Sequence, residues 1–332
     1  MRKAIFLLAI SGPAVVAGAI LLGTKTHPFP APIAPGKFEP ERGCLLGAYV
    51  EGDRKIGASI EKFEALAGKK HASYFRYAGY GKPFPAKWVN KVKAAGAIPN
   101  IALEPNQGLA EVKDDDYLRG WAREAKQAGC PIFLRFASEM NGKWTAYHKD
   151  PRLYVEKFRL VYRVMKQEAP NVALVWTVFG TPASNIVRYY PGDDYVDWVG
   201  TNIYSVHHHN ANLEFPGWQE DPRDFLRPVY RRYAPRKPIQ VSEYGASHTC
   251  GACEQKVSDF AQEKMRLMYD GLRRQFPRVR LIYYFDLDAR FMSNSRNDYS
   301  LTDDPGLLAA YRRLIADPYF LSRLELPSHE KK

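Results

Sequence analysis

Apolar runs alternate with amphipathic stretches along most of the chain. Short apolar runs typical of strands lie at residues 45–50, 72–77, 98–103, 132–137, 172–178, 196–204, 239–242 and 279–285. Helical spacing of apolar positions is found at 58–67, 86–95, 153–168, 223–233, 254–275 and 307–315, with a further helix opening at 114 and the weakest one at 183–190. Eight strands, each followed by a helical segment, predict an α/β fold, a (β/α)8 TIM barrel with a parallel sheet.

The N-terminal residues differ in composition from this repeating part. Met1-Arg2-Lys3 precede an uncharged stretch over residues 4–23, an order typical of a secretory signal and also long enough for a membrane anchor. Prolines recur over the next residues and predict a semi-rigid linker. We therefore expect a signal peptide or membrane anchor over 1–23, a Pro-rich linker over 24–43, one catalytic domain over 44–320 and a C-terminal tail over 321–332.

These features place the protein outside the cytoplasm. We expect it to be secreted or periplasmic, with membrane association through residues 4–23 if that segment is retained. The 332-residue chain carries a formal net charge of +12, which is either a solvated basic face or an attraction to an anionic polysaccharide or membrane surface. Since no nucleic-acid-binding motif accompanies the charge, we expect no nucleic-acid partner. We also expect the protein to be a monomer.

Two glutamates, Glu139 and Glu243, each close a predicted strand. Barrels of this type place their chemistry at the C-terminal ends of the strands, so both carboxylates are expected at the mouth. Positions 139 and 243 are 104 residues apart, which corresponds to three strand–helix units of about 35 residues each. Strand ends at that spacing can face each other across the mouth, and glycosidic bond cleavage requires such a pair of carboxylates.

Polar and aromatic residues surround these strand ends. Arg135 shares the strand parity of Glu139, so its guanidinium is expected to point inward and to keep one carboxylate ionised; Arg76 is a second candidate for that role. Trp144, on the following loop, is expected to stack on a sugar ring unless it serves packing. Tyr204 is expected to hydrogen-bond the nucleophilic carboxylate. The other predicted substrate-binding residues are Glu104, Ser138, Asn141, Trp176, Asn202 and Phe285.

The chain has four cysteines, and two of them form a Cys-x-x-Cys motif. Cys250 and Cys253 could form a tight disulfide, half of a metal site, or free thiols. We favour the disulfide, because export permits it and the sequence offers no second pair of ligands. Cys44 and Cys130 precede strand-like runs and are expected to be buried free thiols.

Three consecutive histidines, His207, His208 and His209, follow the sixth predicted strand. Side chains of neighbouring residues diverge, so joint metal binding is disfavoured against a solvated loop or contact with substrate. We therefore expect no metal ion and no other cofactor.

Several separate motifs over residues 44–290 resemble glycoside hydrolase family 26, the group of β-mannanases and their relatives. They are Gly47-Ala48-Tyr49, Glu104-Pro105, residues 134–142 with Trp144, residues 190–200, Lys237-Pro238-Ile239 and Glu243-Tyr244-Gly245. The resemblance implies a retaining double displacement, with Glu139 as acid/base and Glu243 as nucleophile. The residues by themselves indicate the same pair but not their roles.

The resemblance also implies the substrate, a β-linked polysaccharide that is cleaved internally, with β-1,4-mannan first. Ser138 departs from the family pattern, which usually has histidine before the acid/base glutamate and implicates it in substrate contacts. This departure indicates that the subsite beside the cleaved bond differs from that of an ordinary mannanase, and the alternative substrates are a polysaccharide made by the cell itself, a β-xylan or another β-glycan.

Two other classes of protein compete with the hydrolase. One is a catalytically weak barrel that binds polysaccharide during export, although a pure binder need not keep both glutamates. The other is an exported thiol protein that uses Cys250 and Cys253, which leaves Glu139 and Glu243 without a role.

Overall fold

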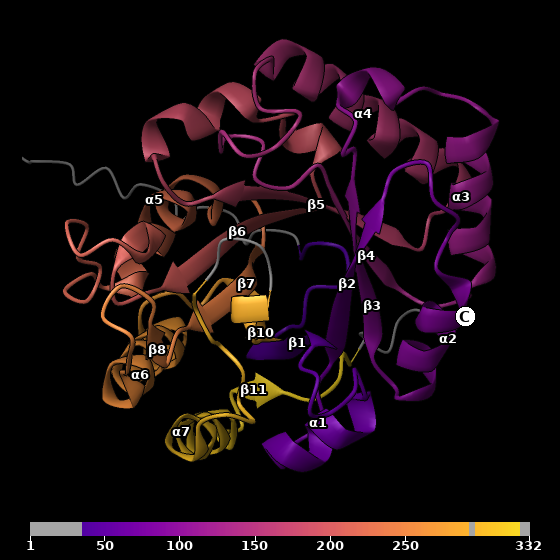
Figure 1. Cartoon of the computed structure of the whole chain (residues 1–332). Helices are drawn as coiled ribbons and strands as arrows, with labels where there is room; N and C mark the ends of the chain where they lie inside the picture. Colours follow the sequence, from indigo (N-terminus) through magenta and orange to yellow (C-terminus); the bar gives the residue numbers. More distant parts are fainter. Residues whose placement is uncertain (1–34, 292–295, 326–332) are drawn as a thin grey trace, which may run out of the picture. The chain divides into compact units, whose positions relative to one another are not determined.

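The structure, a computed structural model, describes residues 35–291 and 296–325. Within these residues, parallel strands form a closed barrel, and helices surround it (Figure 1). Each strand pairs with the next along the ring, and the last pairs with the first. The predicted (β/α)8 barrel is therefore confirmed. Its strands are β1 (Cys44–Gly52), β2 (Ser73–Gly79), β3 (Ile98–Glu104), β4 (Ile132–Phe136), β5 (Val172–Phe179), β6 (Trp198–Ser205), β7 (Ile239–Ala246) and β10 (Val279–Leu287).

Several of the described helices begin at a residue whose side chain caps the first turn. In α4, α5 and α7, an aspartate accepts a backbone N–H of the first turn and a proline follows it, a pair suited to a helix start. The described helices are α1 (Ile60–Ala67), α2 (Ala86–Ala94), α3 (Asp116–Gln127), α4 (Pro151–Glu168), α5 (Pro222–Tyr233), α6 (Ser258–Arg274) and α7 (Pro305–Ile315). The weakest predicted helix is a 3₁₀ segment instead, over Ala183–Tyr189.

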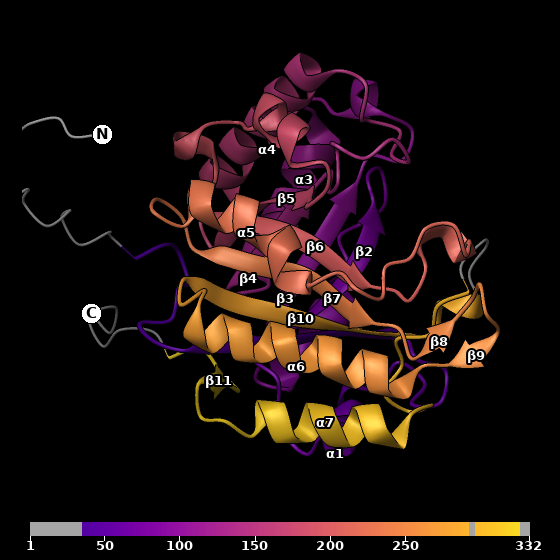
Figure 2. The same cartoon turned by 90° about the vertical axis from the view of Figure 1, so that its left-hand side faces the viewer.

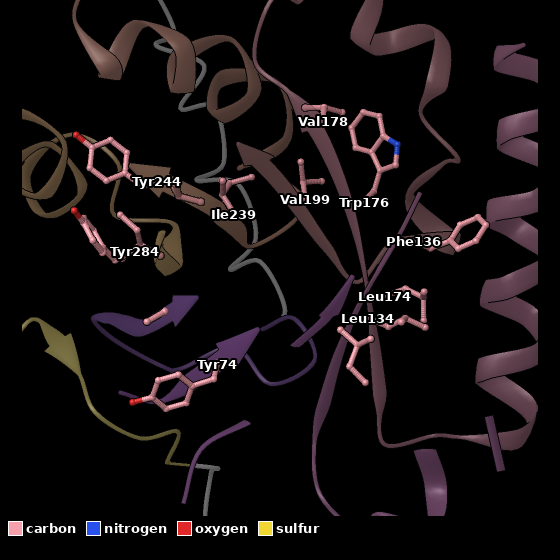
Figure 3. Packing of buried hydrophobic residues seen from close by; sticks show 14 of the residues in the cluster. Tyr74, Leu134, Phe136, Leu174, Trp176, Val178, Val199, Ile239, Tyr244 and Tyr284 are labelled. Carbon is pink, nitrogen blue, oxygen red and sulfur yellow. The ribbon is translucent and has the colours of Figure 1, made fainter. Parts of the chain in front are cut away.

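Strand residues alternate between two buried layers. Leu134, Leu174, Trp176 and Ile239 belong to the layer between strands and helices, part of which Figure 3 shows. Their neighbours of opposite parity, such as Phe133, belong to the separate cluster enclosed by the barrel. Both faces of each strand are buried, which is why the strands read as nearly continuous apolar runs. The strand ends are thereby held in a rigid frame.

The end of the predicted linker packs against the barrel. The side-chain amine of Lys37 donates to the carbonyl of Val172 at 2.8 Å, and the backbone carbonyl of Lys37 accepts a hydrogen bond from the indole N–H of Trp198 at 2.6 Å. Glu39 is buried and pairs with Arg278 at 3.2 Å, and Arg280 lies 3.3 Å from the same carboxylate. The predicted boundary at residue 44 therefore leaves out residues that contact the barrel.

The C-terminal boundary also falls inside an element. The short strand β11 (Phe320–Leu321) pairs with the start of β1, so residue 321 of the predicted tail still belongs to the sheet. Among the described residues, no helix is both long enough and apolar enough to cross a membrane. The predicted signal or anchor over residues 1–23 lies outside the described part of the chain.

The long helix predicted over residues 254–275 begins later, at Ser258. The residues before it form a hairpin of β8 (Thr249–Cys250) and β9 (Gln255–Lys256). The structure joins Cys250 and Cys253 in a disulfide at this hairpin. Cys44 is a buried free thiol, whereas Cys130, predicted to be buried as well, is partly exposed.

Candidate active site

A cleft of about 410 Å³ lies at the C-terminal ends of the barrel strands. Glu139, which follows β4, and Glu243, near the end of β7, both contribute to its wall. The two carboxylates predicted to form a pair therefore share one cavity. The other residues that line it are Tyr77, Glu104, Asn106, Arg135, Ser138, Trp144, Thr145, Ala146, Tyr147 and Asn202.

Glu243 is held by three donors from three different strands. Its Oε1 accepts a hydrogen bond from the Tyr77 hydroxyl at 2.8 Å and contacts the guanidinium of Arg135. Its Oε2 accepts from the hydroxyl of Tyr204. The predicted contact between Tyr204 and this glutamate is therefore present. Donors of this kind stabilise the ionised carboxylate and fix its orientation.

The donors to Glu243 themselves remain protonated. Burial and the nearby charge of Glu243 raise the pKa of both Tyr77 and Tyr204 well above the usual value for tyrosine. Burial acts against the charge of Arg135, but the attraction of Glu243 and its neighbours together outweighs burial, and the pKa of Arg135 is raised. The guanidinium also lies 5.1 Å from the ring centre of Phe75. One carboxylate of the pair thus sits in a positive, donor-rich environment.

Glu139 has a different environment. Its Oε1 accepts from the amide of Asn202 at 2.8 Å, and its Oε2 accepts from the indole N–H of Trp144 at 2.7 Å. Burial, and next the charge of Glu243, raise the pKa of Glu139 to about 7. No ion pair holds Glu139 within the described residues. One carboxyl is therefore placed to carry a proton near neutral pH while its partner contacts a guanidinium, a contrast that acid catalysis uses.

The backbone around Glu139 is held in an unusual conformation. Ala137 and Glu139 have positive φ angles of 49° and 58°, a region that non-glycine residues rarely adopt. The N–H of Glu139 donates to the carbonyl of Thr177 at 3.0 Å, which ties the loop to β5. Such strain persists only where surrounding contacts enforce it.

A buried carboxylate braces the same loop from the other side. Oε2 of Glu104 accepts from the N–H of Ser138 at 3.0 Å and from the hydroxyl of Tyr147 at 2.6 Å. The Tyr147 hydroxyl lies 2.8 Å from the Ser138 carbonyl as well. Burial raises the pKa of Glu104. Ser138 lines the cleft, and its buried hydroxyl is among the groups that lower the pKa of Glu104 against the effect of burial.

A second pocket of about 410 Å³ extends the site. It shares Asn202 with the cleft and is lined mainly by apolar groups, including Phe179, Val206 and Phe225. Trp144 stands at the border, with an edge-on contact to Phe179 at 4.9 Å and a side chain that is 60% exposed. An exposed ring beside the cleft can stack on a sugar, as predicted for Trp144.

Four predicted residues are placed differently. Trp176 is fully buried between strand and helices, 4.9 Å from Tyr190 and 5.3 Å from Tyr233, so the prediction that it binds substrate is wrong. Its side chain has the outward parity of β5. Arg76 also points away from the cleft, toward Glu51 at 3.7 Å and the ring of Trp88.

Asn141 and Phe285 lie near the site without lining the cleft. The amide of Asn141 exchanges two hydrogen bonds with the backbone of Phe179, at 2.8 and 2.9 Å, so its polar groups fasten the loop to β5. Phe285 stacks on Tyr49 at 4.9 Å and contacts the ring of Tyr204 edge-on at 5.4 Å. Both residues therefore support other site residues instead of lining the cleft.

Tyr77, Tyr147 and Asn106 line the cleft but were not predicted from the sequence. Tyr77 directly follows Arg76, and the parity of β2 favours one of the two for the interior. An exact assignment of that parity would have indicated Tyr77. Tyr147 and Asn106 lie on loops, where sequence periodicity carries no such signal.

Comparisons with known proteins give the family and the fold that this chain resembles. The sequence model of Glycosyl hydrolase family 26 matches residues 87–216, a range that includes Glu139 and ends before Glu243. The predicted resemblance to glycoside hydrolase family 26 is confirmed. A β-mannanase of family 26 from Bacteroides ovatus has the same fold, with a TM-score of 0.59 and 14% identity over 88% of this chain and 95% of that one.

Curated relatives are similar in sequence over longer stretches. Endoglucanase H of Acetivibrio thermocellus is 25% identical over 82% of this chain and 30% of its own length. A β-1,3-xylanase of an Alcaligenes species is 30% identical over 53% of this chain and 40% of its own length. The chain thus spans less than half the length of these relatives.

Proposed function

We propose that the protein is a retaining glycoside hydrolase in which Glu139 is the acid/base and Glu243 the nucleophile. The observation that carries the proposal is the contrast between the two carboxyl environments in one cleft. Glu243 accepts from Tyr77, Tyr204 and Arg135, whereas the pKa of Glu139 is raised to about 7. The family 26 resemblance supports the same assignment.

In the first step, the protonated carboxyl of Glu139 donates its proton to the glycosidic oxygen. A carboxylate oxygen of Glu243 attacks the anomeric carbon as the bond to the leaving group breaks, and a covalent glycosyl ester forms. The loss of the proton leaves Glu139 ionised, at the moment when the negative charge of Glu243 is consumed in the ester. Arg135 and the two tyrosines keep Glu243 oriented for the attack.

In the second step, the ionised Glu139 accepts a proton from a water molecule that attacks the anomeric carbon. The bond to Glu243 breaks, and the carboxylate returns to its three donors. Two inversions retain the β configuration. This mechanism requires the two carboxyl groups to lie about 5–5.5 Å apart, whereas an inverting enzyme needs a separation of roughly 6.5–9.5 Å to admit water between them.

The proposed substrate is a β-linked polysaccharide cleaved within the chain. The cleft and the apolar pocket next to it support an extended ligand, because they share Asn202. β-1,4-Mannan is the first candidate by the family 26 resemblance, and the similarity to the β-1,3-xylanase of the Alcaligenes species adds β-1,3-xylan. Ser138, which stands where the family usually has histidine, supports a polysaccharide other than mannan as the alternative.

The setting of the activity is also a proposal. The basic and then apolar order of residues 1–23 supports export to the periplasm or the medium, with or without a retained anchor. We propose that the catalytic domain comprises residues 44–320. The residues that pack against it on either side, among them Lys37, Glu39 and Leu321, would then belong to the same domain. We further propose that it acts as a monomer.

The test is product analysis over a panel of β-mannan, β-1,3-xylan, β-1,4-xylan, β-glucan and bacterial exopolysaccharides. Internal cleavage of one of them, with β-configured ends by NMR at early times and none with Glu243→Ala, supports the proposal. Inverted ends would refute the retaining mechanism. Binding without cleavage of any member would replace the enzyme by a polysaccharide-binding barrel.

A further inference from the structure

Four metal-ligating side chains converge at one point outside the candidate active site. They come from the loop after β6, with His207 and His208, and from the hairpin β8–β9, with Cys250 and Cys253. One ligand atom of each lies within 4.8 Å of the other three. Figure 2 shows this hairpin at the end of the molecule where the loop after β6 also projects.

We propose that His207, His208, Cys250 and Cys253 form a tetrahedral zinc site that joins these two segments. Two thiolates and two imidazoles are a ligand set of structural zinc sites, in which two cysteines separated by two residues form one half. The sequence-based expectation of no metal rested on two arguments. One was the missing second ligand pair, and the other was the divergence of neighbouring histidines.

The structure removes both arguments. The Nδ1 atoms of His207 and His208 lie 3.0 Å apart, so the two neighbouring rings converge instead of diverging. The Nδ1 of His208 is 3.5 Å from the sulphur of Cys250, and both Nδ1 atoms are 3.9 Å from that of Cys253. Zn–N bonds of about 2.1 Å and Zn–S bonds of about 2.3 Å at tetrahedral angles place ligand atoms roughly 3.3–3.8 Å apart.

The surroundings of the four ligands also suit a metal. The backbone N–H of Cys253 donates to the sulphur of Cys250 at 3.0 Å, an interaction that stabilises a thiolate. Cys250 is buried, and the ring of His207 packs edge-on against Phe260 of α6 at 5.3 Å. Two thiolates balance the charge of one Zn²⁺, so the occupied site is neutral.

A disulfide and a metal bound to both sulphurs exclude each other. The disulfide between Cys250 and Cys253 gives the two imidazoles no role, whereas zinc uses all four side chains. The zinc form therefore requires both cysteines to be reduced. This inference concerns metal binding and does not depend on the proposed hydrolase activity.

The site would brace one side of the candidate active site. β6 carries Tyr204 and β7 carries Glu243, and the two segments that share the proposed zinc follow these strands directly. The next residue of the loop, His209, lines the apolar pocket beside the cleft. Zinc would therefore hold the wall of this pocket in place from outside the cleft.

The test uses the full chain, purified under a phosphine reductant, supplied with zinc and freed of excess metal. Mass spectrometry of the metal should find one zinc per chain in the wild type, and none in His207→Ala or Cys250→Ser. His209→Ala, which alters the adjacent histidine that pairs with Glu220, and Cys130→Ser, which alters a thiol elsewhere, should keep the zinc.

A second measurement does not depend on the folding of any variant. Cobalt(II) added to the reduced, zinc-free wild type should give the intense visible bands of tetrahedral coordination together with thiolate-to-metal charge-transfer bands. Removal of zinc by a chelator should lower the melting temperature, and zinc should restore it. Absence of zinc from the reduced wild type, an octahedral cobalt spectrum, or full retention of zinc by His207→Ala and Cys250→Ser would overturn the inference.

Discussion

Arg135 of β4 contacts Glu243 of β7 from the opposite part of the barrel, and both side chains are almost completely buried. A buried carboxylate needs such a partner, because desolvation otherwise disfavours its charge. The contact gives Glu243, the proposed nucleophile, a cationic partner, whereas the donors to Glu139 among the described residues are the neutral side chains of Trp144 and Asn202. The contact also links the proposed catalysis to stability, because removal of either charge leaves the other charge buried without a partner.

Removal of both partners of this pair should therefore cost less than the two single removals added together. We expect Arg135→Met and Glu243→Met to lower the free energy of unfolding by about 3–5 kcal/mol each, since each leaves an unpaired buried charge. The double variant should lose clearly less than the sum of the two. Urea denaturation of the four proteins measures this coupling, and strictly additive losses would contradict the geometry.

The proposed roles of the glutamates predict opposite responses to azide. Glu139→Ala should keep activity on aryl β-glycosides whose leaving group needs no proton, and azide should yield the β-glycosyl azide. Glu243→Ala should lose turnover, and azide should yield no β-configured product. NMR of the products distinguishes the two cases. A β-azide from Glu243→Ala, and none from Glu139→Ala, would exchange the roles.

The raised pKa of Glu139 predicts the alkaline side of the pH profile. Glycosylation needs the protonated acid, and burial together with the Glu243 charge keeps that proton up to a pH of about 7. The kcat/KM should therefore fall as the pH rises through 7. Trp144→Phe keeps an aromatic ring but removes an N–H donor that lowers this pKa, so the fall should move to higher pH. An unchanged profile in this variant would argue against Glu139 as the titrating group.

The hydroxyl donors to Glu243 should matter for turnover more than for binding. Tyr204→Phe and Tyr77→Phe each remove one hydrogen bond to a charged group, an interaction of about 1.5–3 kcal/mol. We expect kcat to fall roughly 10–100-fold in each variant, with a smaller change in KM. Tyr80→Phe is the matched control, because its hydroxyl lies 3.5 Å from the Lys113 carbonyl and does not line the cleft. Equal effects in all three would indicate a general loss of packing.

Ser138 provides a test of substrate preference. Ser138→His restores the residue usual in family 26 and should raise activity on β-1,4-mannan or leave it unharmed, while lowering activity on the natural polysaccharide. The kcat/KM of both proteins over the polysaccharide panel measures the change. If the wild type cleaves mannan efficiently and Ser138→His alters nothing, then Ser138 does not mark a different substrate.

Local patterns in the sequence determined much of the framework. The eight strands follow from apolar runs buried on both faces, and Glu139 and Glu243 follow from their positions at strand ends. The inward direction of Arg135 follows from its parity with Glu139. These features could be predicted because strand alternation and the position of a strand end are properties of a few adjacent residues.

Only the tertiary structure decided which atoms meet across the barrel. Tyr77 reaches Glu243 and Trp176 does not reach the cleft, because a shift of one residue in a strand reverses the direction of its side chains. The hydrogen bonds of Asn141 to Phe179 depend on how a loop folds onto the next strand. The convergence of His207 and His208 with the two cysteines depends on loops that are distant in sequence, and no local period encodes such a contact.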